Sequence, residues 1–139
     1  MSLQTIITQV ATLEAAITGI KRAHDNTPDS LNELPAFVNI PASADIERDP
    51  HVRITTHLIK MELFVLRHTS LQSAETKLRP FVALTLDKFD ANLTLGTTCW
   101  SSWIVHYDYG VLTFGGQQYL GIVFDLKAIE REAVTFLDA

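Results

Sequence analysis

Apolar residues at the start of the chain recur at spacings of three and four, the period of one face of a helix. The pattern predicts an amphipathic helix built on Leu3, Ile6, Val10, Leu13, Ile17 and Ile20. Ser2 stands where it can cap the first turn, and the pattern fades before Pro28. Packing of one apolar face on a sheet is favoured over a coiled coil, because about three heptads lack clear partner charges.

A short extended segment follows this helix. Residues 36–40 (AFVNI) lie between Pro35 and Pro41 and predict a short strand. The next residues, 42–50 (ASADIERDP), are polar and show no periodicity, so they predict a surface loop.

The stretch from Val52 to Arg67 (VRITTHLIKMELFVLR) predicts one unusually long strand of sixteen residues. At ~3.3 Å per residue it would span ~50 Å. A compact domain of this length is only ~37 Å across. We therefore expect the strand either to bend sharply or to project beyond the body of the protein.

The apolar side chains of this predicted strand change faces partway along it. Side chains alternate with a period of two, and Val52, Ile54 and Leu58 share one face. Further on, the opposite face becomes the apolar one, with Ile59, Met61, Leu63 and Val65. One buried face cannot explain both halves. A bulge near residues 58–59 would swap the phase, and so would a second surface that covers the outer half of the strand. The sequence leaves both explanations open.

A second helical stripe follows the long strand. Its apolar members are Leu71, Ala74, Leu78, Phe81, Val82 and Phe89. Thr69 or Ser70 can cap its start. Pro80 lies inside the pattern, where it either kinks one helix or begins a second. Gly96 is expected to end the segment.

Two further segments alternate between apolar and polar residues and predict long strands. In residues 97–110 (TTCWSSWIVHYDYG), one predicted face carries Cys99, Trp103, Val105, Tyr107 and Tyr109. In residues 119–132 (YLGIVFDLKAIERE), one face carries Leu120, Ile122, Phe124, Leu126 and Ala128. Three glycines between the segments, Gly110, Gly115 and Gly116, mark a hairpin loop or tip. The sequence VLTF at 111–114 is unusually apolar for such a loop.

The order of these elements is helix, strand, strand, helix, strand, strand. It predicts an α+β fold with a mostly antiparallel four-stranded sheet and two helices packed on one face, in the order α-β-β-α-β-β. We expect one domain over residues 1–139, because this length suits a single hydrophobic core.

Composition and charge narrow the function. The net charge is −5 and no basic run is present, so binding of duplex DNA through its phosphates is disfavoured. Cys99 is the sole cysteine, which excludes an intrachain disulfide and a CxxC metal pair. The first residues lack the basic region of a secretory signal. We also expect no membrane span, because no stretch approaches the ~18 apolar residues that a span needs.

Candidate chemistry is sparse. His51 and His57 would lie ~20 Å apart along an extended segment, too far to share a metal. Gly115 and Gly116 join two strands, whereas a phosphate-binding loop opens a helix. We therefore expect no catalytic, metal-binding or cofactor-binding residues, no cofactor and no enzymatic activity. The alternative is a small-molecule-binding domain with a pocket lined by Cys99, Trp100, Trp103 and Tyr107.

Several stretches of the chain follow the order of elements of one known family. They are the leading helix, LPAFVNIP at 34–41, ITTHLIKMELFVLR at 54–67, ETKLRPFVALTLDKFDANLTLG at 75–96 and QQYLGIVFDLKAIERE at 117–132. In this order they resemble the tail terminator (tail completion) proteins of long-tailed bacteriophages, the family of the lambda tail terminator. The resemblance covers residues 3–134 and rests on element order and short phrases, not on one diagnostic motif.

This resemblance implies a structural virion protein that forms a hexameric ring at the head-proximal end of a phage tail, in the neck region. The protein would be made in the host bacterial cytoplasm. The ring would stop polymerisation of the tail tube and offer a docking face for the head. Implied partners are further copies of the chain as a homo-oligomer, the tail tube protein, and a head-completion or connector protein. DNA would be only cargo in the lumen, and no membrane is involved. The alternative is another phage neck protein, a head-completion or connector subunit.

A ring needs contact surfaces, and the sequence suggests two. The long strand would present Ile59, Met61, Leu63 and Val65 to a neighbouring subunit or partner. The hairpin tip would present Leu112 and Phe114. The resemblance itself implies no catalytic residue, metal or cofactor.

Overall fold

The computed structural model describes residues 2–67 and 74–134. Its helices and strands are α1 (Leu3–Ala15), β1 (Arg22–His24), β2 (Ala36–Arg48), β3 (Val52–Arg67), α2 (Ala74–Asp90), β4 (Ser101–Phe114) and β5 (Gln117–Ala133). The first predicted helix is α1, and Ser2 caps it by accepting a hydrogen bond from the Thr5 N–H at 3.2 Å.

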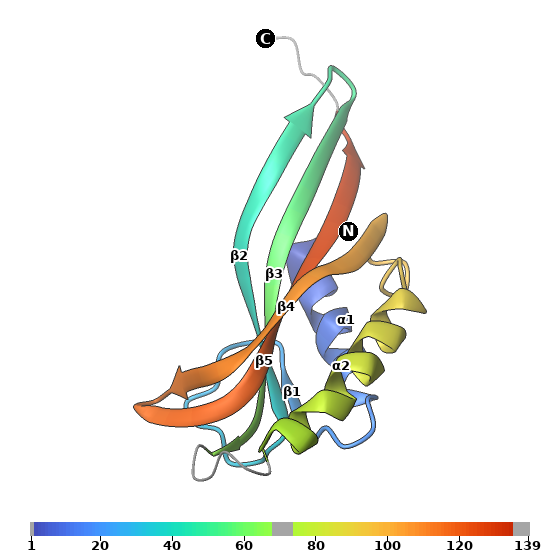
Figure 1. Cartoon of the computed structure of the whole chain (residues 1–139). Helices are drawn as coiled ribbons and strands as arrows, with labels where there is room; N and C mark the ends of the chain where they lie inside the picture. The colour runs from blue at the N-terminus through green and yellow to red at the C-terminus, as the bar shows by residue number, and fades with distance from the viewer. Residues whose placement is uncertain (1, 68–73, 135–139) are drawn as a thin grey trace.

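Within the described residues these strands form a five-stranded sheet in the order β1-β2-β3-β5-β4. β1 runs parallel to β2, and the other neighbouring pairs are antiparallel (Figure 1). The predicted four-stranded antiparallel sheet of order α-β-β-α-β-β is therefore wrong. The sheet is mixed and the order is α-β-β-β-α-β-β. Sequence analysis missed β1 because three residues are too few to show a period of two.

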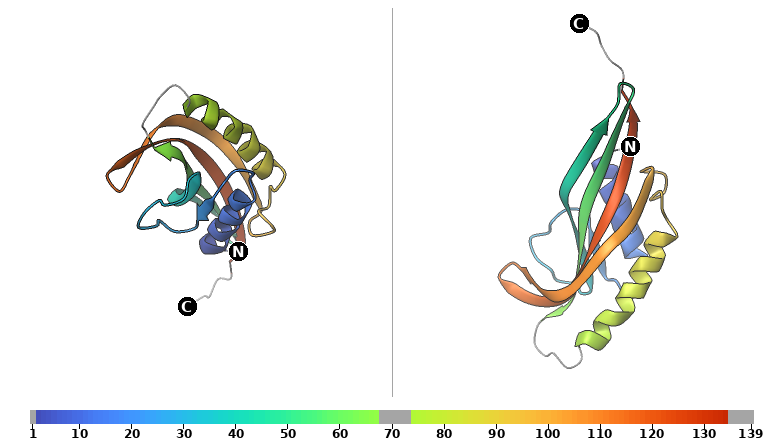
Figure 2. Two further views of the ribbon diagram at one scale, coloured as in Figure 1. Left: turned by 90° about the horizontal axis from the view of Figure 1, so that it is seen from below. Right: turned by 45° about the horizontal axis from the view of Figure 1, so that its top comes forward.

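Both helices lie on one face of the sheet (Figure 2). The main core fills the space between the two helices and the sheet, and most of its sheet residues come from β3 and β5. Its buried members from the sheet include Phe37, Ile59, Met61, Leu63, Ile122, Phe124, Leu126 and Ala128. The apolar face predicted for β5 is thus confirmed.

A smaller apolar cluster lies on the opposite face of the sheet, near the β4–β5 turn. Its buried residues are Leu31, Ala36, Val38, Phe64 and Tyr119. The Phe64 ring meets Phe114 and Tyr119 edge to face, at centroid distances of 5.6 and 5.5 Å. The segment before β2 contributes Leu31 and Leu34, so it covers this end of the face.

Three strands continue past the helices as an arm, made of residues 41–48 of β2, 52–58 of β3 and 127–133 of β5. In Figure 1 the arm rises above both helices. The loop predicted at 42–50 is wrong over most of its length, because β2 extends to Arg48 and pairs with β3. Every β2 residue from Ile40 onward is exposed. With no covered face, this half of β2 carries no apolar alternation that would identify it as a strand.

β3 keeps a single phase from the arm into the body, up to Phe64, and a register shift against β5 follows between Phe64 and Leu66. Its register with β5 is regular from Val52 to Phe64. A bulge in β3 near residues 58–59 is therefore wrong, and the irregularity at that level lies on β2, between Pro41 and Ser43. The change of apolar face seen in the sequence thus persists in the folded strand.

α2 is a continuous helix with Pro80 inside it, so Pro80 does not begin a second helix. The helix ends at Asp90, before Gly96. Gly96 has a φ of 65° and lies in the turns that lead to β4. The predicted caps Thr69 and Ser70, and with them Leu71, lie outside the described residues.

The β4–β5 hairpin closes at Gly115 and Gly116, whose φ angles of 58° and 79° suit a two-residue turn. The VLTF segment is the end of β4 and not a loop.

A register shift between Ile104 and His106 divides β4. Residues opposite each other on antiparallel strands share a face. Trp103 pairs with the exposed Lys127, whereas Tyr107 pairs with the core residue Phe124. The single face predicted for residues 99–109 is therefore wrong.

Candidate functional site

The residues predicted as an interface on β3 lie in the core. Ile59, Met61 and Leu63 are 0% exposed and Val65 is 6% exposed, beneath the two helices. Leu112 and Phe114 are half-buried against the smaller cluster. Within this chain, the four β3 residues offer no open surface, and Leu112 and Phe114 are partly covered.

The open apolar surface lies further out, on the arm. Val52, Ile54 and Leu58 of β3 and Ile129 of β5 are half-buried, and we call them the arm row. The strand register places them on one face: Val52, Ile54 and Leu58 alternate along β3, and Ile129 lies opposite Thr56, which shares their face. Because Ile59, the next residue after Leu58, points into the core, the arm row lies on the face away from the helices.

The helix-side face of the arm is mostly polar. Arg53 forms an ion pair with Glu132, and His57 Nε2 lies 2.9 Å from Glu130 Oε1. Both pairs join β3 to β5 on the face that carries the core further down. The Arg53–Glu132 pair is partly exposed and contributes only ~0–1 kcal/mol, whereas Glu130 is buried. The exception on this face is Ile46, which is 59% exposed. The arm therefore carries more of its large apolar side chains on the face opposite to the one that the body buries.

A second open surface runs along β4, an edge strand of the sheet. Its exposed apolar side chains are Trp103, Val105, Tyr107, Tyr109 and Val111. The Tyr107 ring meets Tyr109 at 5.6 Å and Phe124 at 5.9 Å. Residues 101–114 contain no Lys and no Pro, the residues that commonly protect exposed edges from pairing with other chains. This strand is therefore open to a partner along both its backbone and its side chains.

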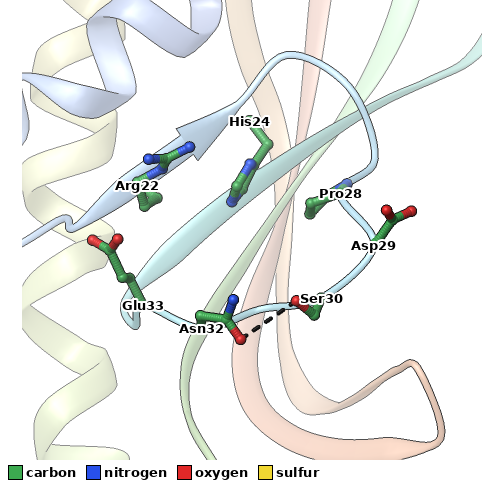
Figure 3. Close-up of a pocket in the computed structure, with 7 residues that line it drawn as sticks. All are labelled: Arg22, His24, Pro28, Asp29, Ser30, Asn32 and Glu33. Atoms are coloured by element: carbon green, nitrogen blue, oxygen red, sulfur yellow. Dashed lines mark hydrogen bonds between the residues drawn. The ribbon is translucent and has the colours of Figure 1, made fainter.

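A polar hollow of about 340 Å³ lies between β1 and the segment before β2 (Figure 3). Arg22 and His24 project from β1, and the segment supplies Pro28, Asp29, Ser30, Asn32 and Glu33. Burial lowers the pKa of His24, and Arg22 adds to this effect. Two basic side chains face two carboxylates here, so the hollow has no net attraction for an anion.

The described residues hold no arrangement suited to nucleophilic catalysis. Ser30, the hydroxyl in the hollow, bonds to Asn32 at 3.4 Å, and a nucleophile requires a base in that position. Burial raises the pKa of the Cys99 thiol, which disfavours the reactive thiolate. His106 Nε2 lies 3.0 Å from Asp108 Oδ2, but both side chains are solvent-exposed.

The alternative aromatic pocket does not assemble. Cys99 is buried, Trp100 stacks beneath Arg131 at 5.9 Å, and Trp103 and Tyr107 face opposite sides of β4. In the part of the chain that the structure describes, no three His, Cys, Asp or Glu side chains come together as metal ligands. Neither helix in that part is long and apolar enough to cross a bilayer.

The sequence pattern located the change of apolar face, but the four β3 residues that it suggested for an interface lie in the core of this chain. It also missed a buried carboxyl, Glu14, which lies on the apolar stripe of α1. A single acidic residue at a core position of a helical period was the signal that was available. Comparison of the chain with protein-family models and with curated proteins finds no match.

Proposed function

We propose that the chain is a structural assembly subunit, a tail terminator that forms a ring at the head-proximal end of a phage tail. The observation that carries this proposal is the arm row: four apolar side chains on a single-layer arm, on the face that neither described helix covers. Such a row is expected where another subunit supplies the missing layer.

A closed ring explains both open surfaces at once. Each copy would receive an arm on one side and offer β4 on the other, so that the same two surfaces are used around the ring. Cyclic symmetry covers such surfaces in every copy without leaving a free end. Six copies is the number that the resemblance to phage tail terminators implies.

The remaining features agree with a role in assembly rather than catalysis. The ring would stop growth of the tail tube and present a docking face to a head-completion or connector protein. A net charge of −5 suits a lumen through which DNA passes without being held. The protein would act in the neck of the virion and needs no cofactor for this role.

Light scattering and native mass spectrometry over a range of protein concentrations test the proposal. We expect a species several times the 15.5 kDa of one chain, with a population that grows with concentration. A chain that stays monomeric at every concentration would contradict ring formation and leave the arm row without its proposed cover.

A matched pair of variants tests the arm row itself. Ile54→Lys places a charge in the row, whereas Thr55→Lys places the same charge on the opposite face, across from Glu130. We expect Ile54→Lys to fold but to dissociate the oligomer, and Thr55→Lys to leave it intact. Equal oligomer in both variants would remove the arm row from the interface.

If a ring forms but does not stop growth of a tail tube in a polymerisation assay, the function moves to another neck protein. A head-completion or connector subunit would show the same oligomer without this effect on the tube.

A further inference from the structure

The interior of the body contains one carboxyl group that the assembly role does not use. Glu14 occupies the last turn of α1, on the same stripe as Ile7 and Val10, and its side chain is 0% exposed. Opposite it, on β2, Asn39 is 2% exposed. Asn39 lies at the level where β2 leaves the body and begins to enter the arm.

The hydrogen bonds of this pair fix the orientation of the amide. Asn39 Nδ2 donates to Glu14 Oε1 at 2.5 Å and to the main-chain oxygen of His24 at 3.0 Å. Both partners accept hydrogen bonds, so the nitrogen and not the oxygen of Asn39 must face them. The pair therefore links α1, β1 and β2 through one amide group.

Two buried oxygens of the pair have no partner among the described residues, Glu14 Oε2 and Asn39 Oδ1. Two unpartnered acceptors are costly in a dry interior. A proton on Glu14 Oε2 would remove the problem, because a carboxylic acid and a primary amide can exchange two hydrogen bonds in a ring. In that pairing Nδ2–H donates to Oε1, and Oε2–H donates to Oδ1.

Among the residues that the structure describes, no charged side chain offsets the burial of Glu14. Burial raises its pKa well above the ordinary value, and the hydrogen bond from Asn39 opposes this only in part. The elements packed against α1 are β1, β2 and α2. Their described charged and titratable side chains are Arg22 and His24 on β1, Asp45, Glu47 and Arg48 on β2, and Lys77, Arg79, Asp87, Lys88 and Asp90 on α2. The side chain that hydrogen-bonds to Glu14 is Asn39. Asp87 and Lys88 border a hollow with residues 16–18, past the end of α1, and His24 turns its main-chain oxygen toward the amide.

We infer that Glu14 is a protonated acid in the folded chain, joined to Asn39 by two hydrogen bonds, and that loss of its proton loosens α1 from β2. Deprotonation breaks the Oε2–H bond and passes the proton to water. It leaves a buried carboxylate that can accept but not donate, facing an amide oxygen with the same limitation. Separation of α1 from the sheet would let water reach the charge, and would expose the core beneath the helix.

The direction of the pH effect follows from the raised pKa. The folded chain holds the Glu14 proton at pH values where the unfolded chain has lost it. Stability from this group is therefore complete below the ordinary pKa of 4.5 and falls as the pH rises toward the folded pKa. Within that window the folding equilibrium constant falls by up to ~10-fold per pH unit.

The test compares the wild-type chain with Glu14→Gln, which keeps the shape, stays neutral and can donate to Asn39 Oδ1. Denaturant unfolding from pH 5 to pH 9 should show a decline in the wild type that Glu14→Gln lacks. Infrared spectra of the folded wild type at pH 6 should contain the C=O stretch of a protonated carboxyl, and Glu14→Gln should lose it. Amide exchange in residues 3–15 should speed up with pH beyond the intrinsic rate in the wild type alone.

Glu47→Gln is the matched control, because it makes the same change at an exposed carboxyl on the arm. It should keep the wild-type pH profile. If Glu14→Gln fails to fold, Glu14→Leu is the second variant. It replaces the titratable carboxyl with an apolar side chain that suits a buried site, and it should give the same flat pH profile. Identical pH profiles in the wild type and the Glu14 variant, with no protonated carboxyl band, would overturn the inference.

Discussion

The two halves of β3 have the same backbone structure but lie in different surroundings. In the body, Ile59, Met61 and Leu63 are completely buried between the sheet and the helices. In the arm, residues 52–58 are all half-buried, and their apolar members lie on the opposite face. A sheet places apolar side chains on the face that has a cover. Among residues 2–67 and 74–134, no helix covers the arm row on the side away from α1 and α2.

The body and the arm also differ in what stabilises them. The body has two layers and a well-packed core, so changes there act on folding. The arm is a single layer held by strand pairing, a turn and a few ion pairs, so changes there should act on local order and on association.

The largest effect is expected at Gly121, in the part of β5 that pairs with the body half of β3. A Cβ at this position would lie 2.0 Å from the main-chain oxygen of Leu63. Two backbones would have to separate, which costs more than the ~1–3 kcal/mol of ordinary overpacking. Gly121→Ala should therefore abolish cooperative folding or lower the denaturation midpoint severely.

Gly110 is the matched control for this change. It pairs with Gly121 across the β4–β5 ladder, but a Cβ there meets nothing within 4 Å. Gly110→Ala should fold with nearly wild-type stability. Similar losses in the two variants would mean that close backbone approach is not what requires glycine at position 121.

An intermediate effect is expected from equal truncations in the two halves of β3. Met61→Ala leaves a cavity in the core and should cost ~2–5 kcal/mol of unfolding free energy. Leu58→Ala removes a half-buried side chain of the arm row and should cost ~1 kcal/mol or less in the monomer. Denaturant titration at low protein concentration measures both. Equal costs would show that the arm is covered within the chain itself.

At high protein concentration, the ranking of Met61→Ala and Leu58→Ala should change. Leu58→Ala should weaken oligomerisation more than it weakens folding, because it removes part of the arm row. Sedimentation of the two variants across a concentration series would distinguish the effects. An oligomer unaffected by Leu58→Ala would argue against a role of this residue in assembly.

The sequence predicts those elements in which apolar residues recur with a regular helical or strand period. The stripe of α1 and the apolar face of β5 are regular over many residues and were found with the correct faces. The change of face along β3 was found as well, although its cause was left open. The patterns of α1 and β5 reflect burial against a layer within the same chain.

The features that were missed have no such pattern. The arm half of β2 is exposed on both faces and was taken for a loop. The bulge at Val105 shifts the alternation of β4 by one residue, which reversed the predicted face of Trp103 relative to Tyr107. Glu14 is one polar residue within an otherwise apolar stripe, and only its contact with Asn39, 25 residues away, shows what it does.

The smallest effect concerns the turn that closes the arm between β2 and β3. Asp49 Oδ1 accepts hydrogen bonds from the His51 and Val52 N–H groups, each at 2.8 Å. These bonds favour the carboxylate and lower the pKa of Asp49. Their contribution is therefore present above the ordinary pKa of 3.8 and is lost as the pH falls through the lowered folded value.

Asp49→Ala should speed amide exchange at His51 and Val52 and leave the core amides of β3 unchanged, because the turn lies at the far end of the arm. Asp49→Asn keeps an oxygen acceptor without the charge, so it should retain much of the protection and lose the acid dependence. Asp45→Ala is the control for charge alone, since it removes a carboxylate from the exposed β2 strand. Loss of core protection in Asp49→Ala would show that the arm and the body unfold as one unit, and the division drawn between the two halves of β3 would then fail.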